Sequence, residues 1–183
     1  MSFNFLKNEA VTSKPSAALL PWLTHQQSLT RRLQNTVGKV PQLTLLKQQW
    51  HKVDWWDQHV LGLKEGEKAL HREIVISINA RECWYGRTVI PINTYQHYED
   101  FFARLKQESL GELIFGNNLI TRMNLNYYCI SAQSIEYYWL KPFLHVNEDL
   151  WARFAVFAIN KHLPFYLIEI LLPDLLEATN ELA

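Results

Sequence analysis

The sequence predicts an α+β domain in which helices cover one face of an antiparallel sheet. Two β-hairpins carry this prediction, one around residues 69–91 and one around residues 151–172. The segment between them, residues 94–116, has helical spacing of its apolar residues instead. Helices clustered among antiparallel hairpins are typical of α+β domains. The chain has 183 residues, a length that fits one domain.

The first part of the chain predicts one helix and one strand. Residues 1–18 are expected to form a flexible lead-in, so that the domain itself occupies residues 19–183. A helix is predicted to begin after Ser28, because Ser is a favoured N-cap and apolar residues follow at helical spacing. Residues 42–50 predict a strand, and residues 54–59 a loop or a helical turn.

The two hairpins and the segment between them account for most of the remaining chain. Residues 69–78 alternate in polarity and residues 83–91 are rich in β-forming residues, with a short polar connection between them. Thr94 is predicted to cap the helix that follows, and Ser109 a second, shorter one. Three further strands are predicted over residues 119–130, 151–159 and 163–172. Residues 131–148 fit no regular pattern.

Composition excludes several classes of function. Lys and Arg together number 18, as do Asp and Glu, so no bulk charge draws the chain to nucleic acid or to an anionic membrane. We see no signal peptide and no apolar run of the roughly 18 residues that a span needs, which predicts a cytoplasmic protein without membrane insertion. Cys83 and Cys129 form no CxxC pair and are expected to be reduced thiols. The seven His show no metal-ligand spacing, so no metal is expected.

Arg72 is the first candidate functional residue. Because side chains alternate along a strand, Arg72 shares a face with Leu70, Ile74 and Ile76, and it is the sole charge on that face. A buried guanidinium needs an anionic partner, and its planar fork suits a carboxylate. The alternatives are an arginine that reaches water from the strand end, and a structural ion pair.

Glu169 presents the same problem with the opposite charge. Its strand, residues 164–173, is apolar on both faces, which predicts a carboxylate with a raised pKa unless a cation lies near. Such a group suits general acid–base catalysis. A salt bridge between Glu169 and Arg72 without any chemistry is the alternative.

Two helix starts add a weaker indication. Ser109 and Glu112 fit a capping box, and Ser28 offers a plain cap. The first amides of a helix lack internal acceptors and attract anions. Leu29 and Leu110 would lie at these starts. Arg87, Arg122 and Arg153 are further candidates, although each is more often a surface or packing arginine.

In these residues the sequence resembles the chorismate pyruvate-lyase family, from about Leu20 to Pro173. The blocks that carry the resemblance lie in a shared order and spacing. They are WLTHQQSLTRRL (22–33), REI (72–74), GRTVIP (86–91), SLGELIF (109–115), LITR (119–122), LWAR (150–153) and LIEILLP (167–173). Residues 131–148 look like an insertion relative to shorter members.

The resemblance implies a fold and a site. It implies an antiparallel sheet of about six strands, an internal ligand pocket under helical flaps, and a monomer that uses no metal or cofactor. It places the family's product-binding arginine at Arg72 and its essential glutamate at Glu169. Two positions that contact the ligand, partly through backbone amides, fall on Leu29 and Leu110.

The resemblance also implies an activity, the elimination of pyruvate from chorismate to give 4-hydroxybenzoate at the first committed step of ubiquinone biosynthesis. Arg72 and the amides of Leu29 and Leu110 would hold the ring carboxylate. Glu169 would act near C4 as a base or polarise the 4-hydroxyl. Arg153 or Arg87 would hold the second carboxylate. Persistent contacts with the product predict product inhibition.

Two other functions remain open at this point. The same fold serves as the effector-binding domain of some bacterial transcription regulators, where Arg72 and Glu169 could bind a small acid without chemistry. Residues 1–60 are too short and too neutral to supply a DNA-binding helix-turn-helix domain, which favours the enzyme. A degenerate lyase homologue with a structural Arg72–Glu169 pair is the third possibility.

Overall fold

One antiparallel sheet forms the centre of the molecule. The computed structural model describes residues 14–143 and 148–180. Its strands are β1 (Gln42–Lys52), β2 (Lys68–Ile78), β3 (Arg81–Pro91), β4 (Ile120–Ile130), β5 (Leu150–Ile159) and β6 (Leu163–Leu171). They lie in the order β1-β2-β3-β6-β5-β4, and every neighbouring pair is antiparallel. The predicted single α+β domain with about six antiparallel strands is confirmed.

The helices are short and lie between the strands in the chain. They are α1 (Leu20–Leu23), α2 (Leu29–Val37), α3 (Trp55–Leu61), α4 (Ile92–His97), α5 (Glu99–Ala103), the 3-10 helix η2 (Arg104–Lys106), α6 (Leu110–Ile114), α7 (Ile135–Leu140) and α8 (Asp174–Asn180). None of the described helices is long and apolar enough to cross a membrane. The predicted lead-in, residues 1–18, falls largely outside the described residues.

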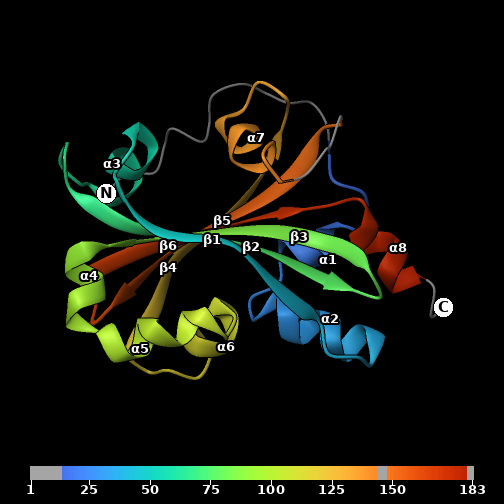
Figure 1. The fold of residues 1–183 in the computed structure, drawn as a ribbon. Helices are drawn as coiled ribbons and strands as arrows, with labels where there is room; N and C mark the ends of the chain where they lie inside the picture. Colours follow the sequence, from blue (N-terminus) through green and yellow to red (C-terminus); the bar gives the residue numbers. More distant parts are fainter. Residues whose placement is uncertain (1–13, 144–147, 181–183) are drawn as a thin grey trace.

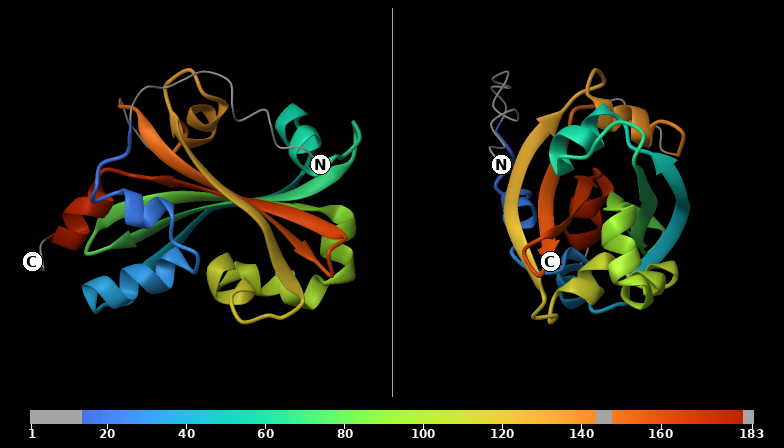
Figure 2. Two further views of the ribbon diagram at one scale, coloured as in Figure 1. Left: turned by 180° about the vertical axis from the view of Figure 1, so that it is seen from behind. Right: turned by 90° about the vertical axis from the view of Figure 1, so that its left-hand side faces the viewer.

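The helices are distributed over both faces of the sheet (Figure 1). Helices α2, α4, α5 and α6 lie on the face that carries Arg72, where the prediction placed the helical cover. Helices α3 and α7 lie on the opposite face, where the sequence predicted no helices. The end-on view in Figure 2 shows how strongly the sheet curves, with β1 and β4 at its two outer sides.

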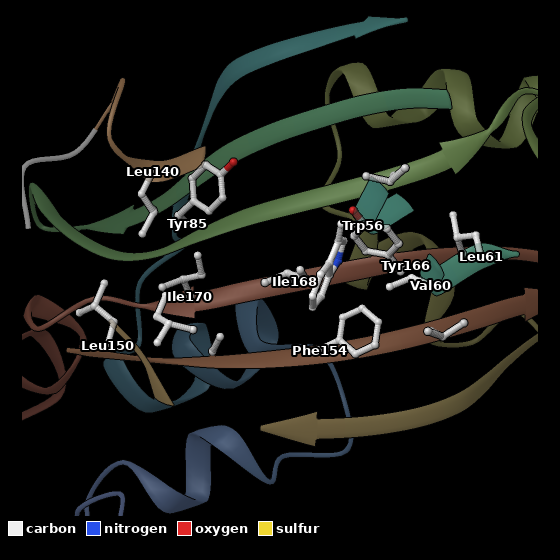
Figure 3. Close-up of a cluster of buried hydrophobic side chains, with 14 of the residues drawn as sticks. Trp56, Val60, Leu61, Tyr85, Leu140, Leu150, Phe154, Tyr166, Ile168 and Ile170 are labelled. Atoms are coloured by element: carbon white, nitrogen blue, oxygen red, sulfur yellow. The ribbon is translucent and has the colours of Figure 1, made fainter. Parts of the chain in front are cut away.

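The face under α3 and α7 has a core of its own (Figure 3). Trp56, Val60 and Leu61 from α3 and Leu140 from α7 pack on alternate residues of the strands, such as Phe154. The Trp56 and Phe154 rings meet edge to face with 6.4 Å between centroids, a favourable geometry for aromatic pairs. This apolar core packs α3 and α7 against the back of the pocket floor.

Both predicted hairpins are present. Asn79 and Ala80 connect β2 to β3, and the three residues 160–162 connect β5 to β6. The first two residues of each connection have positive φ: Asn79, Ala80, Asn160 and Lys161. Two successive left-handed residues match the twist of the flanking strands, which is why Asn is favoured there.

The prediction for Thr94 is wrong. Helix α4 begins at Ile92 with Pro91 at its N-cap, three residues before the predicted cap, and the Thr94 hydroxyl donates 3.0 Å to the carbonyl of Pro164 instead. The helical segment around Phe101 is also broken into α4, α5 and η2, because the backbone leaves helical geometry at Tyr98.

Two segments that the sequence left undecided form helices. Residues 54–59 belong to α3, where Asp54 and Asp57 make a capping box. In residues 131–148 the chain forms α7, and Trp139 from this helix packs edge to face on Trp56. Residues 144–147 lie outside the described part of the chain.

Candidate active site

A pocket lies between the sheet and the starts of α2 and α6. Every strand except β1 contributes to its floor. The lining residues are Gln27, Ser28, Leu29, Thr30, Arg72, Ile74, Ile76, Trp84, Gly86, Thr88, Ser109, Leu110, Gly111, Phe115, Arg122, Arg153, Ala155, Phe157, Leu167 and Glu169. The ionisable members are three arginines and one glutamate.

The register of the strands brings the charged residues together. Ile74, Gly86, Glu169 and Arg153 are successive cross-strand partners on β2, β3, β6 and β5, so their side chains leave the same face. A Cβ at Gly86 would lie 3.1 Å from Cγ1 of Ile74. The absence of a side chain at Gly86 lets Ile74 pack against β3 beside Glu169.

Arg72 is fully buried and only partly satisfied. Its Nε donates 2.9 Å to the carbonyl of Leu105, and its Nη2 donates 3.0 Å to the carbonyl of Glu108. Its Nη1 is buried and has no partner among the described residues. Burial lowers the pKa of the Arg72 guanidinium to about 10, so it stays charged at neutral pH. Arg72 neither reaches water nor pairs with Glu169, and Nη1 can bind an acid.

Glu169 pairs with Arg153. Its Oε2 lies 2.9 Å from Nε of Arg153, an ion pair whose angle is poor for a hydrogen bond. Both Nη atoms of Arg153 donate to backbone carbonyls, at 2.9 Å to Trp22 and 3.0 Å to His25. Burial raises the pKa of Glu169, although the charges of Arg153 and Arg122 oppose the shift. A carboxylate with a raised pKa in a pocket suits general acid–base work.

The starts of α2 and α6 close over the pocket. Ser28 accepts a hydrogen bond from the Arg31 amide, and Ser109 and Glu112 form the predicted capping box. The two helix starts touch, since a Cβ at Gly111 would lie 2.7 Å from Oγ of Ser28. The amides of Leu29 and Leu110 occupy first-turn positions, which have no acceptor within their helices.

The structure therefore brings five of the six predicted site residues to one pocket: Arg72, Glu169, Leu29, Leu110 and Arg153. Arg122, which the sequence offered only as a general candidate, lines the pocket as well. Arg87 does not.

Arg87 lies on the other face of the sheet in a polar cluster with Asp57, His71 and Tyr166, here called the far-face cluster. Its Nη2 donates 3.1 Å to Nδ1 of His71 and lies 3.5 Å from Oδ1 of Asp57. Its guanidinium carbon lies 3.8 Å from the centroid of the Trp139 ring. The sequence offered Arg87 as a partner for a ligand carboxylate, but its side chain does not line the pocket. Gly86 lies on the pocket face, and because side chains alternate along β3, the next residue, Arg87, points to the other face.

Metal ligands do not gather in the described part of the chain. Over residues 14–143 and 148–180, no group of three or more His, Cys, Asp and Glu side chains is placed to hold a metal ion.

Solved structures with this fold share little sequence with the chain. PhnF from Mycobacterium smegmatis superposes with a TM-score of 0.60 at 15% identity, covering 82% of this chain and 66% of that one. The C-terminal domain of the histidine utilization repressor from Pseudomonas syringae pv. tomato gives 0.56 at 13% identity, covering 73% and 92%. The class is thus a single α+β domain of the fold that these proteins also adopt, with a pocket lined by three arginines and one glutamate on one face of its sheet.

Sequence comparison identifies the family. The family described as chorismate lyase matches residues 4–179. A probable chorismate pyruvate-lyase of Coxiella burnetii is 30% identical over 92% of this chain and 90% of its own length. Another, from Pseudomonas syringae pv. tomato, is 29% identical over 96% and 90%. The chain belongs to the chorismate lyase family.

Proposed function

We propose that this protein is a chorismate pyruvate-lyase that converts chorismate into 4-hydroxybenzoate and pyruvate, the first committed step of ubiquinone biosynthesis. The observation that carries the proposal is the buried Nη1 of Arg72, which has no partner in residues 14–143 and 148–180, in a pocket that also holds a buried carboxylate at Glu169. Family membership and the names of the relatives support the same activity.

Arg72 binds the ring carboxylate in this proposal. Its Nη1 donates to one carboxylate oxygen, and the first amides of α2 and α6, at Leu29 and Leu110, supply further donors. Charge-assisted hydrogen bonds of this kind are short and strong. Because Arg72 is already held by two carbonyls, it needs little reorganisation when the acid binds.

Glu169 acts at the opposite end of the ring. It removes the C4 proton, the C3–oxygen bond breaks, and the ring becomes aromatic while the enolpyruvyl arm leaves as the enolate of pyruvate. Protonation of that enolate at its methylene carbon gives pyruvate. Aromatisation drives the reaction, so the protein has to orient the ring, exclude water and accept one proton.

The product keeps both groups that the pocket contacts. 4-Hydroxybenzoate retains the ring carboxylate for Arg72 and the 4-hydroxyl for Glu169. Helices α2 and α6, which touch at Ser28 and Gly111, must separate to release it. Slow release and product inhibition follow, as in other lidded enzymes.

The alternative is a non-catalytic module of the same fold that binds a small acid. Its support is a structural likeness at 12% to 15% sequence identity, which concerns the fold alone. A cytoplasmic, monomeric and cofactor-free protein stays a prediction of the sequence.

A direct assay separates these functions. Purified protein is mixed with chorismate, 4-hydroxybenzoate is followed by absorbance, and pyruvate by a coupled assay. Equal amounts of both products, formed faster than in a protein-free control, are expected. Chorismate binding without turnover would favour the non-catalytic module instead.

A further inference from the structure

Arg122 enters the pocket from the outer strand β4. Its Nη2 donates to Oε1 of Gln26, in the segment that leads into α2. Its guanidinium carbon lies 5.8 Å from the centroid of the Phe115 ring, beyond the end of α6. Its Nη1 is buried and has no partner among the described residues. The side chain is thus fixed on two sides and keeps one terminal nitrogen for a ligand.

Arg153, the neighbouring arginine of the pocket, has fewer donors free for a ligand than Arg122 has. Both terminal nitrogens of Arg153 donate to backbone carbonyls, and its Nε faces Glu169. These contacts anchor the segment before α2 and hold Glu169 in place. A second ligand carboxylate therefore has a better partner in Arg122 than in Arg153.

The charges of the pocket support a ligand with two negative groups. Three guanidiniums and one carboxylate line it, which leaves two positive charges when Glu169 is ionised. Arg122 and Arg153 share Glu169 as their counter-charge. Burial and the charge of Arg153 lower the pKa of Arg122, and the charge of Glu169 opposes this shift. A further anion beside Arg122 would complete the balance, and chorismate carries two carboxylates where 4-hydroxybenzoate carries one.

We propose that Arg122 binds the carboxylate of the enolpyruvyl arm and so distinguishes substrate from product. The proposal rests on the proposed function, because it assigns the second carboxylate of the same substrate. Arg72 then holds the ring carboxylate and Arg122 the departing arm, with Glu169 and Arg153 between them. Elimination breaks the bond that ties the two ends together, so Arg122 loses its hold on the aromatic product.

Substitution of Arg122 should therefore affect the two ligands differently. For Arg122→Gln we expect KM for chorismate to rise by about 10- to 100-fold, the usual scale for a lost charge-assisted hydrogen bond. The Kd of 4-hydroxybenzoate, measured by calorimetry, should stay within about threefold of wild type, a change of under about 0.7 kcal/mol, because the product has no second carboxylate for Arg122 to bind. Arg122→Lys should restore part of the chorismate affinity because it keeps the charge.

The matched control is Arg31→Gln, which removes the same charge from the exposed side of α2 and should change neither value. Intact binding of 4-hydroxybenzoate also shows that the Arg122 variants are folded. An equal loss for both ligands, or an unchanged KM for chorismate, would overturn the assignment.

Failure of the proposed function gives a different result. If wild-type protein binds chorismate without turnover, the lyase proposal fails, while calorimetry with chorismate and 4-hydroxybenzoate still tests Arg122. Selective loss of chorismate binding in Arg122→Gln would then support the subsite, and parallel loss would reject it.

Discussion

Arg153 and Glu169 are cross-strand partners on β5 and β6, and their side chains form an ion pair with 2.9 Å between Nε and Oε2. The pair lies on the pocket side of the sheet. Because Arg153 is anchored by the carbonyls of Trp22 and His25, it fixes the position of Glu169 in turn. This arrangement separates the carboxylate from Arg72, so that each can contact a different end of a bound ring.

Glu169→Gln should separate catalysis from binding. The amide can still hydrogen-bond the product hydroxyl but cannot take a proton. We expect turnover to fall by about 10²-fold or more, the usual scale for a lost acid–base group. Product affinity should stay within about tenfold of wild type. Chorismate turnover and calorimetry with 4-hydroxybenzoate, on one preparation, provide the measurement. Unchanged turnover would remove Glu169 from the chemistry.

The pH dependence of turnover should reveal the raised pKa of Glu169. A carboxylate accepts a proton only when it is ionised, so activity is lost as pH falls through its pKa. Burial raises that pKa above the ordinary 4.5 in the ligand-free protein, so the acid limb of kcat/KM, which reports the free enzyme, should lie correspondingly higher. Arg122→Gln removes a charge that opposes the shift, so its acid limb should move further toward neutral pH. An acid limb at or below the ordinary value would contradict this assignment.

Arg72→Lys should be severely impaired although it keeps a positive charge. Lysine cannot donate to the carbonyls of Leu105 and Glu108 while also offering a fork to the ligand. We expect kcat/KM to fall by about 10²-fold, the scale of one lost charge-assisted hydrogen bond at about 1.5–3 kcal/mol. Arg31→Lys, on the exposed side of α2, is the matched control. Wild-type activity in Arg72→Lys would refute the carboxylate clamp.

Asp57 in the far-face cluster should govern stability at acid pH. Burial alone would raise its pKa, but the contact with Nε2 of His71, 3.0 Å from Oδ2, and the charge of Arg87 outweigh burial and lower it. A carboxylate with a lowered folded pKa stabilises the fold above its unfolded pKa, about 3.9, and this stability is lost as pH falls through the folded value.

Asp57→Asn should therefore lower the free energy of unfolding at neutral pH by about 3–5 kcal/mol, because a buried partner of Arg87 is lost. Its melting temperature should also vary less than that of wild type below about pH 4. Asp100→Asn, an exposed substitution, serves as the control in thermal unfolding between acid and neutral pH. Equal acid sensitivity of wild type and Asp57→Asn would show that the carboxylate has no such role.

The charged residues of the pocket could be predicted from the sequence to the extent that they break a local pattern. Arg72 stands out because the other residues on its face of the strand are apolar, and Glu169 because its strand is otherwise apolar on both faces. Leu29 and Leu110 follow from the Ser caps before them. The sequence could not show whether Arg87 faces the pocket, because that depends on which face of β3 forms the pocket floor. The structure shows that Gly86 lies on that face, so Arg87 lies on the other.

Arg122 was harder to place for a geometric reason. The register of β4 against β5 shifts between Arg122 and Asn124, so simple alternation along residues 119–130 does not predict which face Arg122 occupies. Its role depends also on Gln26 and Phe115, which are distant in the chain and meet it only in the folded molecule.

We expect the contact between Ser28 and Gly111, and with it the pocket, to form late in folding. The two hairpins rest on local contacts and can form early, whereas this contact joins distant segments. Helix α6 spans only Leu110–Ile114 and is too short to persist alone. It can therefore detach by local unfolding while the sheet stays intact. A bound acid must suppress this opening, so hydrogen exchange at α6 should slow with ligand while exchange in β3 does not.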